Sequence, residues 1–538
     1  MLKRLLEQVF RNGATAASDE EDLAQSKRFE EAALAAGRDG DLDWAAQAAS
    51  DALEQNPQSV VARFCLGNVF YSKGRLDDAI RIYYQALDIQ VDNASIHYNL
   101  ALALQTRGDT GDAIAHFRRT VELNPDSAEE HSTLLFPLNA DPSADPVAVA
   151  REHVLWGQRF ADPLIRRTPH ANLRDPHRRL RIGYVSGDFS AHAASPFIAP
   201  LLANHDRECF EIFGFANADF LPGEAAFPGT RWHTIIGVDD EKAARLIEAE
   251  GIDILVDLSG HTKGNRLLVF ARKPAPLQMT MLGYPNTTGL AAMDYRITDI
   301  HGDPPGATEH LYRERLLRLR ECLWCFSPSS LAPPPRPAPC ISNGHVTFGS
   351  LNAAYKLNDR VFEAWIAILG AVPESRMIVA TIPKGEAQRR IFDRFGSAGI
   401  VPERIEIMER QPVADYWKLV SRVDLALDSF PCGGGATICE ALWLGVPTLT
   451  LAGLTFLQRA GLSLLTNVGL EELVARSVDE YVQKAGALGR APAEIVRLRN
   501  GLRDRLASSP ITDARRYARN LEVLYRNAWI EWCGRCQC

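Results

Sequence analysis

The sequence lacks a long uninterrupted hydrophobic run. No stretch reaches the ~18 consecutive apolar residues that mark a membrane-spanning helix. Residues 1–25 mix charges early and contain neither the apolar segment nor the small-residue cleavage site of a signal peptide. We therefore expect a cytoplasmic protein that does not act at a membrane.

Concentrated positive charge is also missing. The net charge is −8, and the Lys and Arg residues are scattered along the chain. A nucleic-acid surface normally shows a basic patch, so we expect no nucleic-acid partner. A phosphate ligand is still compatible with this charge balance, because one lysine and a few backbone donors are enough to bind it.

Cysteine is sparse and shows no disulfide framework, with ten in 538 residues. Cys322 and Cys325 stand close together, as do Cys533, Cys536 and Cys538, but no further metal ligands lie in register with them, which favours unpaired thiols. Paired acids or His/Glu clusters with metal-ligand spacing are missing too. We expect no metal site, no cofactor and a metal-independent mechanism.

A period of 34 residues runs through the first quarter of the chain. Small residues in register suit paired antiparallel helices, since glycine permits the tight turn, alanine allows close approach and an aromatic residue fills the gap to the next pair. The period and residue classes indicate about three tetratricopeptide repeats over residues 24–130. A generic helical bundle would not hold one register at so many positions. The spacing relates Gly40 to Gly74 to Gly108, Ala45 to Ala79 to Ala113, and Tyr83 to Phe117.

The remaining chain is too long for one ordinary core. Residues 131–178 read as a helical connector, and residues 179–326 alternate between apolar strands and helices. A Pro-rich linker at residues 327–340 separates this first α/β lobe from a second, at residues 341–538. Ligands of open α/β sheets bind at the carboxyl ends of the strands, so the two lobes imply a cleft there. The strands expected most clearly are Leu180–Val185, Ile252–Leu258, Val346–Leu351 and Arg376–Thr381.

The strongest local motif is an apolar strand at residues 425–427 that runs through the glycines Gly433–Gly435 into an apolar-periodic helix. Glycines let the backbone approach a diphosphate, and the first helical N–H groups point at it with the positive end of the helix dipole. Thr437 can donate a hydroxyl hydrogen bond, and Glu440 can reach both hydroxyls of a ribose. The alternative is a glycine-rich turn that binds nothing.

Two further candidates follow predicted strands. Lys356 comes after the first strand of the second lobe, where its ammonium could neutralise a departing nucleotide diphosphate, although a solvated surface lysine is the alternative. His192 lies in the matching loop of the first lobe and has an intrinsic pKa suited to proton transfer. His233 and His261, near other strand ends, are weaker candidates for an acceptor or sugar site. A lone histidine is more often structural or exposed, and that alternative stays open for all three.

Together these segments resemble the O-linked N-acetylglucosamine transferase/SPINDLY family of glycosyltransferases. The resemblance extends over nearly the whole chain from about residue 25, with several long motifs in one order. It implies tetratricopeptide repeats followed by a GT-B, or double Rossmann-like, catalytic region, and inverting transfer of a sugar to Ser or Thr of proteins. The segments that carry it are Arg181–Asp188, Val256–Thr262, Arg272–Gln278, Leu282–Gly289 and Asp294–Asp299, with the stretches around Lys356 and Glu440.

The resemblance also implies roles for individual residues. His192 matches an active-site histidine close to the sugar and acceptor, and Lys356 matches the lysine on the donor diphosphate. Glu440 matches the ribose-binding acid, and His233 loosely matches a second histidine of the first lobe. The residues that match the nucleotide-sugar site are Asn352, Tyr416, Cys432, Gly433, Gly434, Gly435, Ala436, Thr437 and Glu440.

Some positions depart from the family pattern. Ala353 stands where some members carry Gln, Ala436 and Ile438 replace hydroxyl or small residues, and Tyr416 replaces a His that packs beside the base. The family includes transferases of N-acetylglucosamine from UDP and of fucose from GDP, and the segment Leu282–Gly289 resembles both branches. The departures therefore leave the base and the sugar open.

We expect a protein O-glycosyltransferase that uses UDP-N-acetylglucosamine and binds its acceptor protein through the repeats. One alternative is transfer of fucose or another sugar to a dedicated acceptor. Another is a repeat scaffold whose catalytic lobes have decayed. The three candidate side chains His192, Lys356 and Glu440 argue against decay, whereas the altered phosphate turn argues for it. The sequence leaves the acceptor and the oligomeric state open, a homodimer included.

Overall fold

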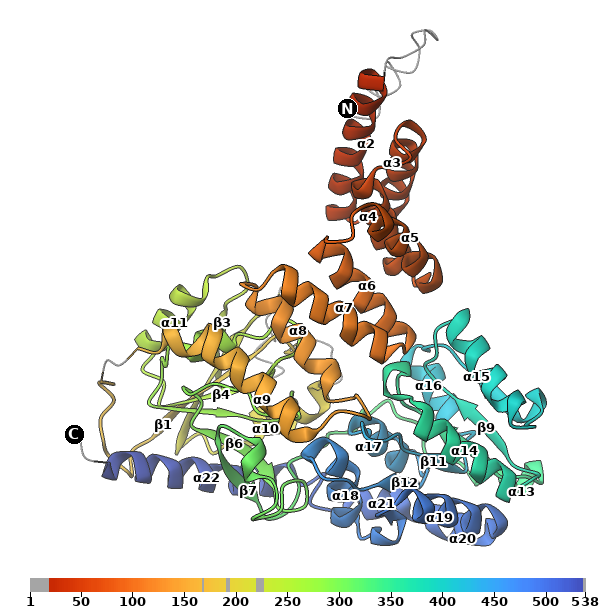
Figure 1. Cartoon of the computed structure of the whole chain (residues 1–538). Helices are drawn as coiled ribbons and strands as arrows, with labels where there is room; N and C mark the ends of the chain where they lie inside the picture. Colours follow the sequence, from red (N-terminus) through yellow and green to blue (C-terminus); the bar gives the residue numbers. More distant parts are fainter. Residues whose placement is uncertain (1–18, 167–168, 190–193, 219–226, 536–538) are drawn as a thin grey trace. The chain divides into compact units, whose positions relative to one another are not determined.

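Helices form the first part of the chain, and alternating strands and helices follow, as the colours of Figure 1 show. The computed structural model describes residues 19–166, 169–189, 194–218 and 227–535. The chain divides into two compact units, with the boundary between Asp126 and Ser127.

The first unit is built from successive pairs of antiparallel helices. Each helix packs most closely on its partner and then on the next pair, which is the arrangement of a repeat array. Its described helices are α2 (Asp19–Arg38), α3 (Leu42–Gln55), α4 (Val60–Ser72), α5 (Leu76–Ile89), α6 (Ala94–Arg107) and α7 (Thr110–Leu123).

The turn glycines predicted from the 34-residue period lie between the helices of each pair. Gly40, Gly74 and Gly108 have φ angles of 77°, 71° and 101°, in the left-handed region that residues with a Cβ rarely adopt. Ala45 and Ala79 are almost completely buried where the helices meet. Each of these positions is therefore fixed by the backbone or by close packing.

The aromatic position of the repeat has the predicted packing role. Tyr83 and Phe117 are both buried, and a Cβ placed on Gly67 would lie 2.4 Å from the ring of Tyr83. A glycine on one helix thus makes room for the aromatic ring of the next. The helical repeat array predicted from the sequence is confirmed.

The helices that follow the repeats, α8 (Ala128–Leu138) and α9 (Pro146–Trp156), belong to the second unit. Asn139, just after α8, donates to the hydroxyl of Tyr284 at 2.9 Å. After α9 the chain continues through a π-helical turn, Gly157–Ala161, and a 3₁₀ turn, Asp162–Leu164. A Cβ on Gly157 would lie 1.8 Å from the carbonyl oxygen of Gly289, so this turn packs directly on the first α/β lobe.

The first lobe is a parallel sheet in the strand order β3-β2-β1-β4-β5-β6-β7. This order reverses direction at β1 and β4, as in a Rossmann fold, and ligands of such sheets bind at the carboxyl ends of the strands beside that point. The strands are β1 (Leu180–Ser186), β2 (Phe210–Ala216), β3 (Thr230–Thr234), β4 (Ile254–Asp257), β5 (Leu277–Thr280), β6 (Tyr295–Asp299) and β7 (Arg315–Leu319). The helices are α10 (Ser195–Asn204), α11 (Asp240–Ala249), α12 (Leu267–Ala271) and the 3₁₀ turn η3 (Glu309–Leu311).

The second lobe repeats this order as β10-β9-β8-β11-β12-β13, so the expectation of two α/β lobes is confirmed. Its strands are β8 (Thr347–Ser350), β9 (Arg376–Val379), β10 (Ile405–Ile407), β11 (Leu425–Leu427), β12 (Thr448–Leu451) and β13 (Val474–Ala475). Its α-helices are α13 (Cys340–Asn343), α14 (Asp359–Ala371), α15 (Glu386–Ser397), α16 (Val413–Val420), α17 (Ala436–Trp443), α18 (Phe456–Val468), α19 (Val478–Arg490), α20 (Pro492–Arg499) and α21 (Leu502–Ala507). The 3₁₀ turns η4 (Ala354–Lys356), η5 (Pro402–Arg404) and η6 (Glu471–Leu473) complete it.

The last helix, α22 (Ala514–Gly534), corrects one expectation. The sequence interpretation places it in the second lobe, but it packs on the first. The hydroxyls of Tyr525 and Tyr184 lie 3.0 Å apart, and Glu522 contacts Nδ1 of His205 at 3.0 Å. The amphipathic pattern of a helix shows that one face is buried, but it does not say on which lobe.

The Pro-rich segment between the lobes has no helix or strand from Ser327 to Pro339. Arg503 and Arg499 of the second lobe donate to carbonyl oxygens of this segment, at Pro333 and Arg336. The linker is therefore held against the second lobe.

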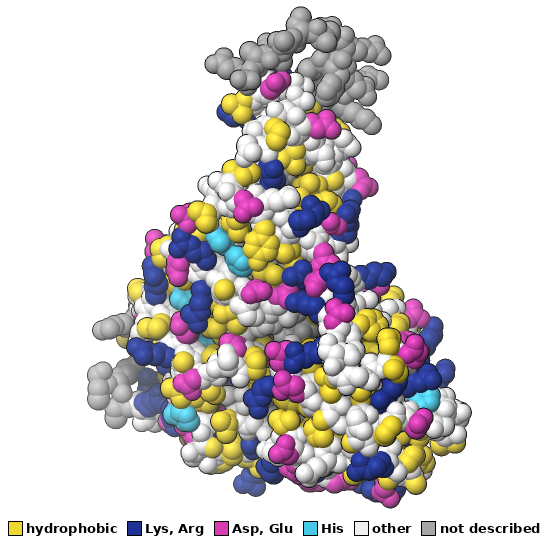
Figure 2. Space-filling model, turned by 45° about the vertical axis from the view of Figure 1, so that its right-hand side comes forward, with side chains coloured by type: hydrophobic (Ala, Val, Ile, Leu, Met, Phe, Trp, Pro, Cys, Tyr) yellow, Lys and Arg dark blue, Asp and Glu magenta, His cyan; other side chains and the backbone are white. Residues whose placement is uncertain are grey.

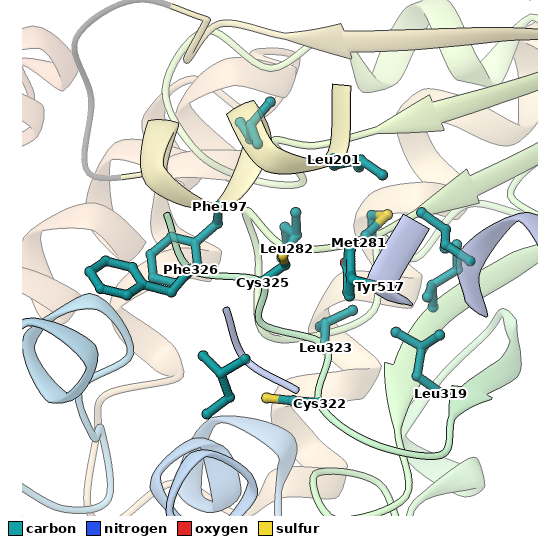
Figure 3. Packing of buried hydrophobic residues seen from close by; sticks show 14 of the residues in the cluster. Phe197, Leu201, Met281, Leu282, Leu319, Cys322, Leu323, Cys325, Phe326 and Tyr517 are labelled. Carbon is teal, nitrogen blue, oxygen red and sulfur yellow. The ribbon is translucent and has the colours of Figure 1, made fainter. Parts of the chain in front are cut away.

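One hydrophobic core runs through both lobes and includes Cys439 and Phe456 of the second. Figure 3 shows a part of it, where Phe197 of α10 lies beside Phe326 with ring centroids 5.6 Å apart. Cys322 and Cys325 are buried in the same core as free thiols. Cys536 and Cys538, also predicted to be unpaired, lie outside the described residues.

Charged side chains of both signs are interspersed over the face in Figure 2, and no block of one sign stands out among the residues coloured there. Within the described part of the chain, no helix combines the length and the hydrophobicity needed to cross a membrane.

Candidate functional site

Two adjacent strands of the second sheet deliver the candidate residues to one edge. Strands β8 and β11 pair in parallel, with Phe348 opposite Leu425 and Gly349 opposite Ala426. Their carboxyl ends therefore lie side by side, at the point where the strand order reverses. Asn352 follows β8 and Asp428 follows β11, and the two side chains meet at 3.0 Å.

The turn after β11 is built around the carboxylate of Asp428. Its Oδ1 accepts the backbone N–H of Gly434 at 2.8 Å and the side-chain amide of Asn352, and its Oδ2 accepts the hydroxyl of Thr450 at 2.8 Å. Within the turn, Ser429 Oγ donates to the carbonyl oxygen of Cys432 at 2.7 Å. The turn is thus fixed from both sides before any ligand binds.

The three glycines of the turn are required by packing rather than by left-handed backbone. A Cβ on Gly434 would lie 2.0 Å from Thr437 Oγ1, and one on Gly433 would lie 2.8 Å from Asp428 Oδ2. A Cβ on Gly435 would lie 3.2 Å from the ring of Trp324. Because the φ angles of these glycines are not positive, the crowding is what selects glycine here.

Helix α17 begins directly after the turn, at Ala436, with Gly435 in the capping position. No side chain caps its first N–H groups. Uncapped N–H groups and the positive end of the helix dipole favour an anion at this point. The side chain of Ala436 packs against the hydrophobic core and leaves these donors uncovered by a polar group of its own.

Lys356 brings a full positive charge to the same turn. Its Nζ donates to the carbonyl oxygen of Gly433 at 2.8 Å and approaches Oδ1 of Asn352 at 3.4 Å. Burial works against the charge, but Cys432, Tyr355 and Asp428 act in the other direction and raise the pKa of Lys356 above its ordinary value. The amine is therefore an ammonium at neutral pH.

Glu440 lies one turn into α17 and is partly buried. Burial raises the pKa of its carboxyl group, and no described side chain donates a hydrogen bond to it. Burial, with the nearby Glu440 as a second cause, raises the pKa of Tyr416, whose hydroxyl is buried without a hydrogen-bond partner in the described structure. These two polar groups have capacity for a ligand that both donates and accepts hydrogen bonds.

The structure thus gathers most of the predicted second-lobe residues around one strand edge. Thr437 Oγ1 lies 3.4 Å from Asn352 Oδ1, a long contact that a better acceptor could replace. Cys432 is buried beside Lys356, and burial raises the pKa of its thiol. The residues brought together are Asn352, Lys356, Cys432, Gly433, Gly434, Gly435, Ala436 and Thr437, with Glu440 one turn further along α17 and Tyr416 of α16 near Glu440.

His192, the candidate catalytic histidine, lies outside the described residues. The chain resumes at Ala194, and Phe197 of α10 packs edge-on against Trp324, with ring centroids 5.4 Å apart. Since Trp324 lies against Gly435, the start of α10 is one side chain away from the glycine turn.

Sequence reasoning missed two residues of this site. Asp428 was visible as an acid at the end of an apolar strand, directly before the glycine turn. For Trp324 no signal exists in the sequence, because its role depends on the way the two lobes meet.

His261 does not have the predicted role in an acceptor or sugar site. Its Nε2 donates to the carbonyl oxygen of Thr288 at 2.9 Å and its Nδ1 accepts from Ser132 Oγ at 2.8 Å. The ring is 2% exposed and packs edge-on against Trp156, and burial lowers its pKa well below the ordinary value. Both nitrogens are used in joining α8 to the first lobe, so this prediction was wrong.

His233 lies on β3, near the edge of the first sheet. Its ring stacks on Phe215, with centroids 5.3 Å apart, and its Nε2 lies 3.2 Å from a carboxylate oxygen of Glu250. Glu250 directly follows α11, and His233 itself is the fourth residue of β3, paired with Phe215 near the carboxyl ends of the two strands. The assignment of His233 to an acceptor or sugar site stays a prediction.

Two Rossmann-like lobes, with a glycine turn and a lysine at the switch point of the second, are typical of two-lobed nucleotide-binding proteins. The profile of glycosyl transferase family 41 matches residues 124–325 and 334–521, and profiles of tetratricopeptide repeats match residues 67–108 and 94–127. The chain belongs to glycosyl transferase family 41.

Individual relatives agree with this assignment. The probable UDP-N-acetylglucosamine–peptide N-acetylglucosaminyltransferase SPINDLY of Solanum lycopersicum is 37% identical over 391 residues, which cover 71% of this chain and 42% of that protein. The corresponding protein SEC of Arabidopsis thaliana is 28% identical over 380 residues, covering 66% of this chain and 38% of that protein. This chain therefore spans less than half the length of the curated relatives it matches.

A solved structure of a mutant O-GlcNAc transferase from Thermobaculum terrenum is similar over nearly the whole chain. The match covers 97% of this chain and 99% of that chain, with 34% sequence identity and a TM-score of 0.87. The repeat array followed by two α/β lobes is thus shared with a solved member of the family.

Proposed function

We propose that this chain is a protein O-glycosyltransferase that transfers N-acetylglucosamine from UDP-N-acetylglucosamine to Ser or Thr of acceptor proteins. The observation that supports it most directly is the convergence on one turn of the Lys356 ammonium and the uncapped start of α17. Both favour a diphosphate. The family assignment and the names of the relatives support the choice of sugar and acceptor.

In the proposed mechanism the donor diphosphate lies at the glycine turn. The acceptor hydroxyl attacks the anomeric carbon from the face opposite the diphosphate, so that a C–O bond to the acceptor forms as the C–O bond to the phosphate breaks. Lys356 and the α17 N–H groups stabilise the charge that develops on the leaving diphosphate. His192 is the proposed group beside the sugar and the acceptor, and it is suited to take up the acceptor proton.

The remaining residues bind the nucleoside. Glu440 lies one turn into α17, and its carboxylate is proposed to accept hydrogen bonds from the ribose hydroxyls. Tyr416, with its unpartnered hydroxyl, lies next to Glu440 and is proposed to contact the base. No metal ion or cofactor is part of this scheme.

Transfer of fucose from GDP-fucose is the second candidate. It is favoured by the resemblance of the segment Leu282–Gly289 to the fucosyl branch, and the contacts of this segment explain its side chains in another way. Within the segment Leu282–Gly289, Thr287 Oγ1 donates to Glu314 at 2.6 Å and Asn286 donates to Asn139 at 2.8 Å. These side chains hold the segment against its surroundings, so their likeness to the fucosyl branch says little about the donor.

A donor panel separates the candidates. The purified full chain is incubated with UDP-N-acetylglucosamine, GDP-fucose and other nucleotide sugars, and the released nucleotide is measured. Release from UDP-N-acetylglucosamine above all other donors supports the proposal, and release from GDP-fucose alone selects the second candidate. A folded protein that neither binds nor cleaves any donor is a scaffold.

A further inference from the structure

Asp428 is buried in the candidate donor site, but the proposed reaction gives its carboxylate no role. Its side chain is buried, with the residue 2% exposed, and its carboxylate accepts hydrogen bonds from Gly434, Asn352 and Thr450. These contacts span 2.8–3.0 Å, and they come from the turn, from the loop after β8 and from β12. One buried group thus connects three elements of the donor site.

The connection reaches Lys356 through a single side chain. Asn352 donates its amide to Asp428 and presents its Oδ1 toward Lys356 Nζ and Thr437 Oγ1, each at 3.4 Å. The orientation of the Asn352 amide is therefore set by the carboxylate. If Asp428 no longer accepted this hydrogen bond, the amide would be free to rotate and the acceptor beside Lys356 would be lost.

Asp428 also acts on the charge of Lys356. The groups that act on the lysine charge are Cys432, Tyr355 and Asp428. Burial raises the pKa of Cys432, and burial raises the pKa of Tyr355 to about 12, so both are uncharged at neutral pH. Burial raises the pKa of Asp428 too, but its three hydrogen-bond donors and Lys356 oppose that rise, and these donors fit the anion.

The first lobe contains the same arrangement without the lysine. At the end of β4, Asp257 accepts the backbone N–H of Gly260 at 2.9 Å and the hydroxyl of Thr280 at 2.7 Å. Strands β4 and β5 occupy the same places in their sheet as β11 and β12 do in theirs. A buried aspartate thus follows the equivalent strand in both lobes. In the second lobe this aspartate, Asp428, also interacts electrostatically with Lys356.

We propose that Asp428 is a positioning residue of the transfer reaction: it fixes the glycine turn, orients Asn352 and keeps Lys356 charged and aimed at the donor diphosphate. The inference rests on the proposed function, because it assumes that a nucleotide diphosphate occupies the turn.

The test is Asp428→Asn in the full chain. Asparagine keeps the shape and one acceptor oxygen but removes the charge. Binding of UDP and of GDP is measured by calorimetry across a pH series, together with kcat and KM for donor cleavage. Without the carboxylate the pKa of Lys356 falls, so the several-fold part of nucleotide affinity that depends on its charge should be lost at a lower pH on the alkaline side than in the unaltered protein. The value of kcat should fall by at least about tenfold, and KM should change less.

Two control variants separate this role from a purely structural one. Asp257→Asn removes the equivalent acid of the first lobe and should leave the alkaline midpoint of nucleotide binding where it is in the unaltered protein. Thr450→Val removes a donor that favours the charged form of Asp428. In a Glu440→Gln background, which removes the pH dependence that Glu440 contributes, it should move the acid-side loss of binding to higher pH and leave the alkaline side unchanged.

The outcomes are distinct. If the unaltered protein binds neither UDP nor GDP, the proposed function is wrong. If it binds and Asp428→Asn keeps the same alkaline midpoint, the positioning role is wrong, as it is if Asp257→Asn produces the same shift. Should Asp428→Asn fail to fold in a thermal melt, Thr450→Val decides, and an unchanged acid-side midpoint then overturns the inference.

Discussion

Lys356 places a full positive charge against the glycine turn, since its ammonium donates to the carbonyl oxygen of Gly433 at 2.8 Å. A leaving diphosphate gains negative charge as the bond breaks, so this contact should strengthen in the transition state. We expect Lys356→Met to lower kcat at least about a hundredfold while donor affinity changes only several-fold. Steady-state kinetics with calorimetry of donor binding measure both quantities.

A near-normal kcat for Lys356→Met would contradict this role. The same assay tests the metal-independent mechanism, because EDTA added to the unaltered protein should leave turnover nearly unchanged. If chelation alone stops turnover, a metal ion carries the leaving-group charge and Lys356 does not.

Glu440 should affect nucleotide binding, whereas Lys356 should affect mainly kcat. A carboxylate that binds two ribose hydroxyls makes charge-assisted hydrogen bonds of roughly 1.5–3 kcal/mol each. Glu440→Ala should therefore weaken binding of the free nucleotide diphosphate by at least about tenfold, with an unchanged thermal melt. Equal affinity in calorimetry, with normal folding, removes Glu440 from the site.

The pKa of Glu440 predicts the direction of a pH effect. Burial raises this pKa, so the carboxyl group stays protonated to a higher pH than an exposed glutamate does. Its charge-assisted bonds to a ribose form as the pH rises through the raised pKa. Glu440→Gln, which cannot ionise, should lose this part of the pH dependence, and a pH series of nucleotide affinity shows whether it does.

At the scale of elements, the junction between the glycine turn and α17 is the most sensitive. A Cβ on Gly434 would overlap Thr437 Oγ1 at 2.0 Å and crowd Asn352 Oδ1 at 3.2 Å. Gly434→Ala should displace the turn and abolish detectable nucleotide binding. Gly370→Ala is the matched control, because Gly370 lies inside α14 with nothing within 4 Å of its added Cβ. The control should bind normally and gain about 0.5–1 kcal/mol of stability from its higher helix propensity.

The elements themselves were largely predictable from the sequence, for identifiable reasons. The 34-residue period fixed the helix pairs because each turn needs a glycine with positive φ, as at Gly74. Apolar runs located strands such as β1 and β8 to within about two residues, since buried parallel strands are apolar throughout. No local sequence pattern shows which part of the protein a buried helix face or side chain packs against. The placement of α22 on the first lobe and of Trp324 against Gly435 therefore required the structure.

The candidate site shows the same division. Glycines and a lysine that follow a predicted strand can be recognised in the sequence, because these residue types are rare within a hydrophobic core. Histidines do not, and His261 illustrates why: its two hydrogen bonds come from residues 129 and 27 positions away along the chain. Whether a histidine is free to react depends on such distant partners, which only the folded chain reveals.

At the scale of the whole molecule, the division into two units suggests a division of labour. The repeat unit ends at Asp126, and every predicted second-lobe site residue lies beyond it. Stacked helix pairs form a surface suited to an extended peptide, so we propose that the repeats present the acceptor protein. The catalytic chemistry is then a property of the second unit alone.

Removing residues 1–126 tests this division, and the structure sets where to cut. Helix α8 starts at Ala128, and the indole of Trp156 donates to the Ala128 carbonyl oxygen at 2.9 Å, so a cut at residue 130 would damage the second unit. The shortened protein should still cleave the nucleotide-sugar donor slowly, because the glycine turn, Lys356 and Glu440 are retained. It should no longer glycosylate a protein acceptor that the full chain modifies. Mass spectrometry of the acceptor and nucleotide release by the same sample measure the two activities side by side. Loss of both from a fragment that still melts cooperatively would show that the repeats contribute to the chemistry itself, and retained glycosylation would show that the acceptor binds elsewhere.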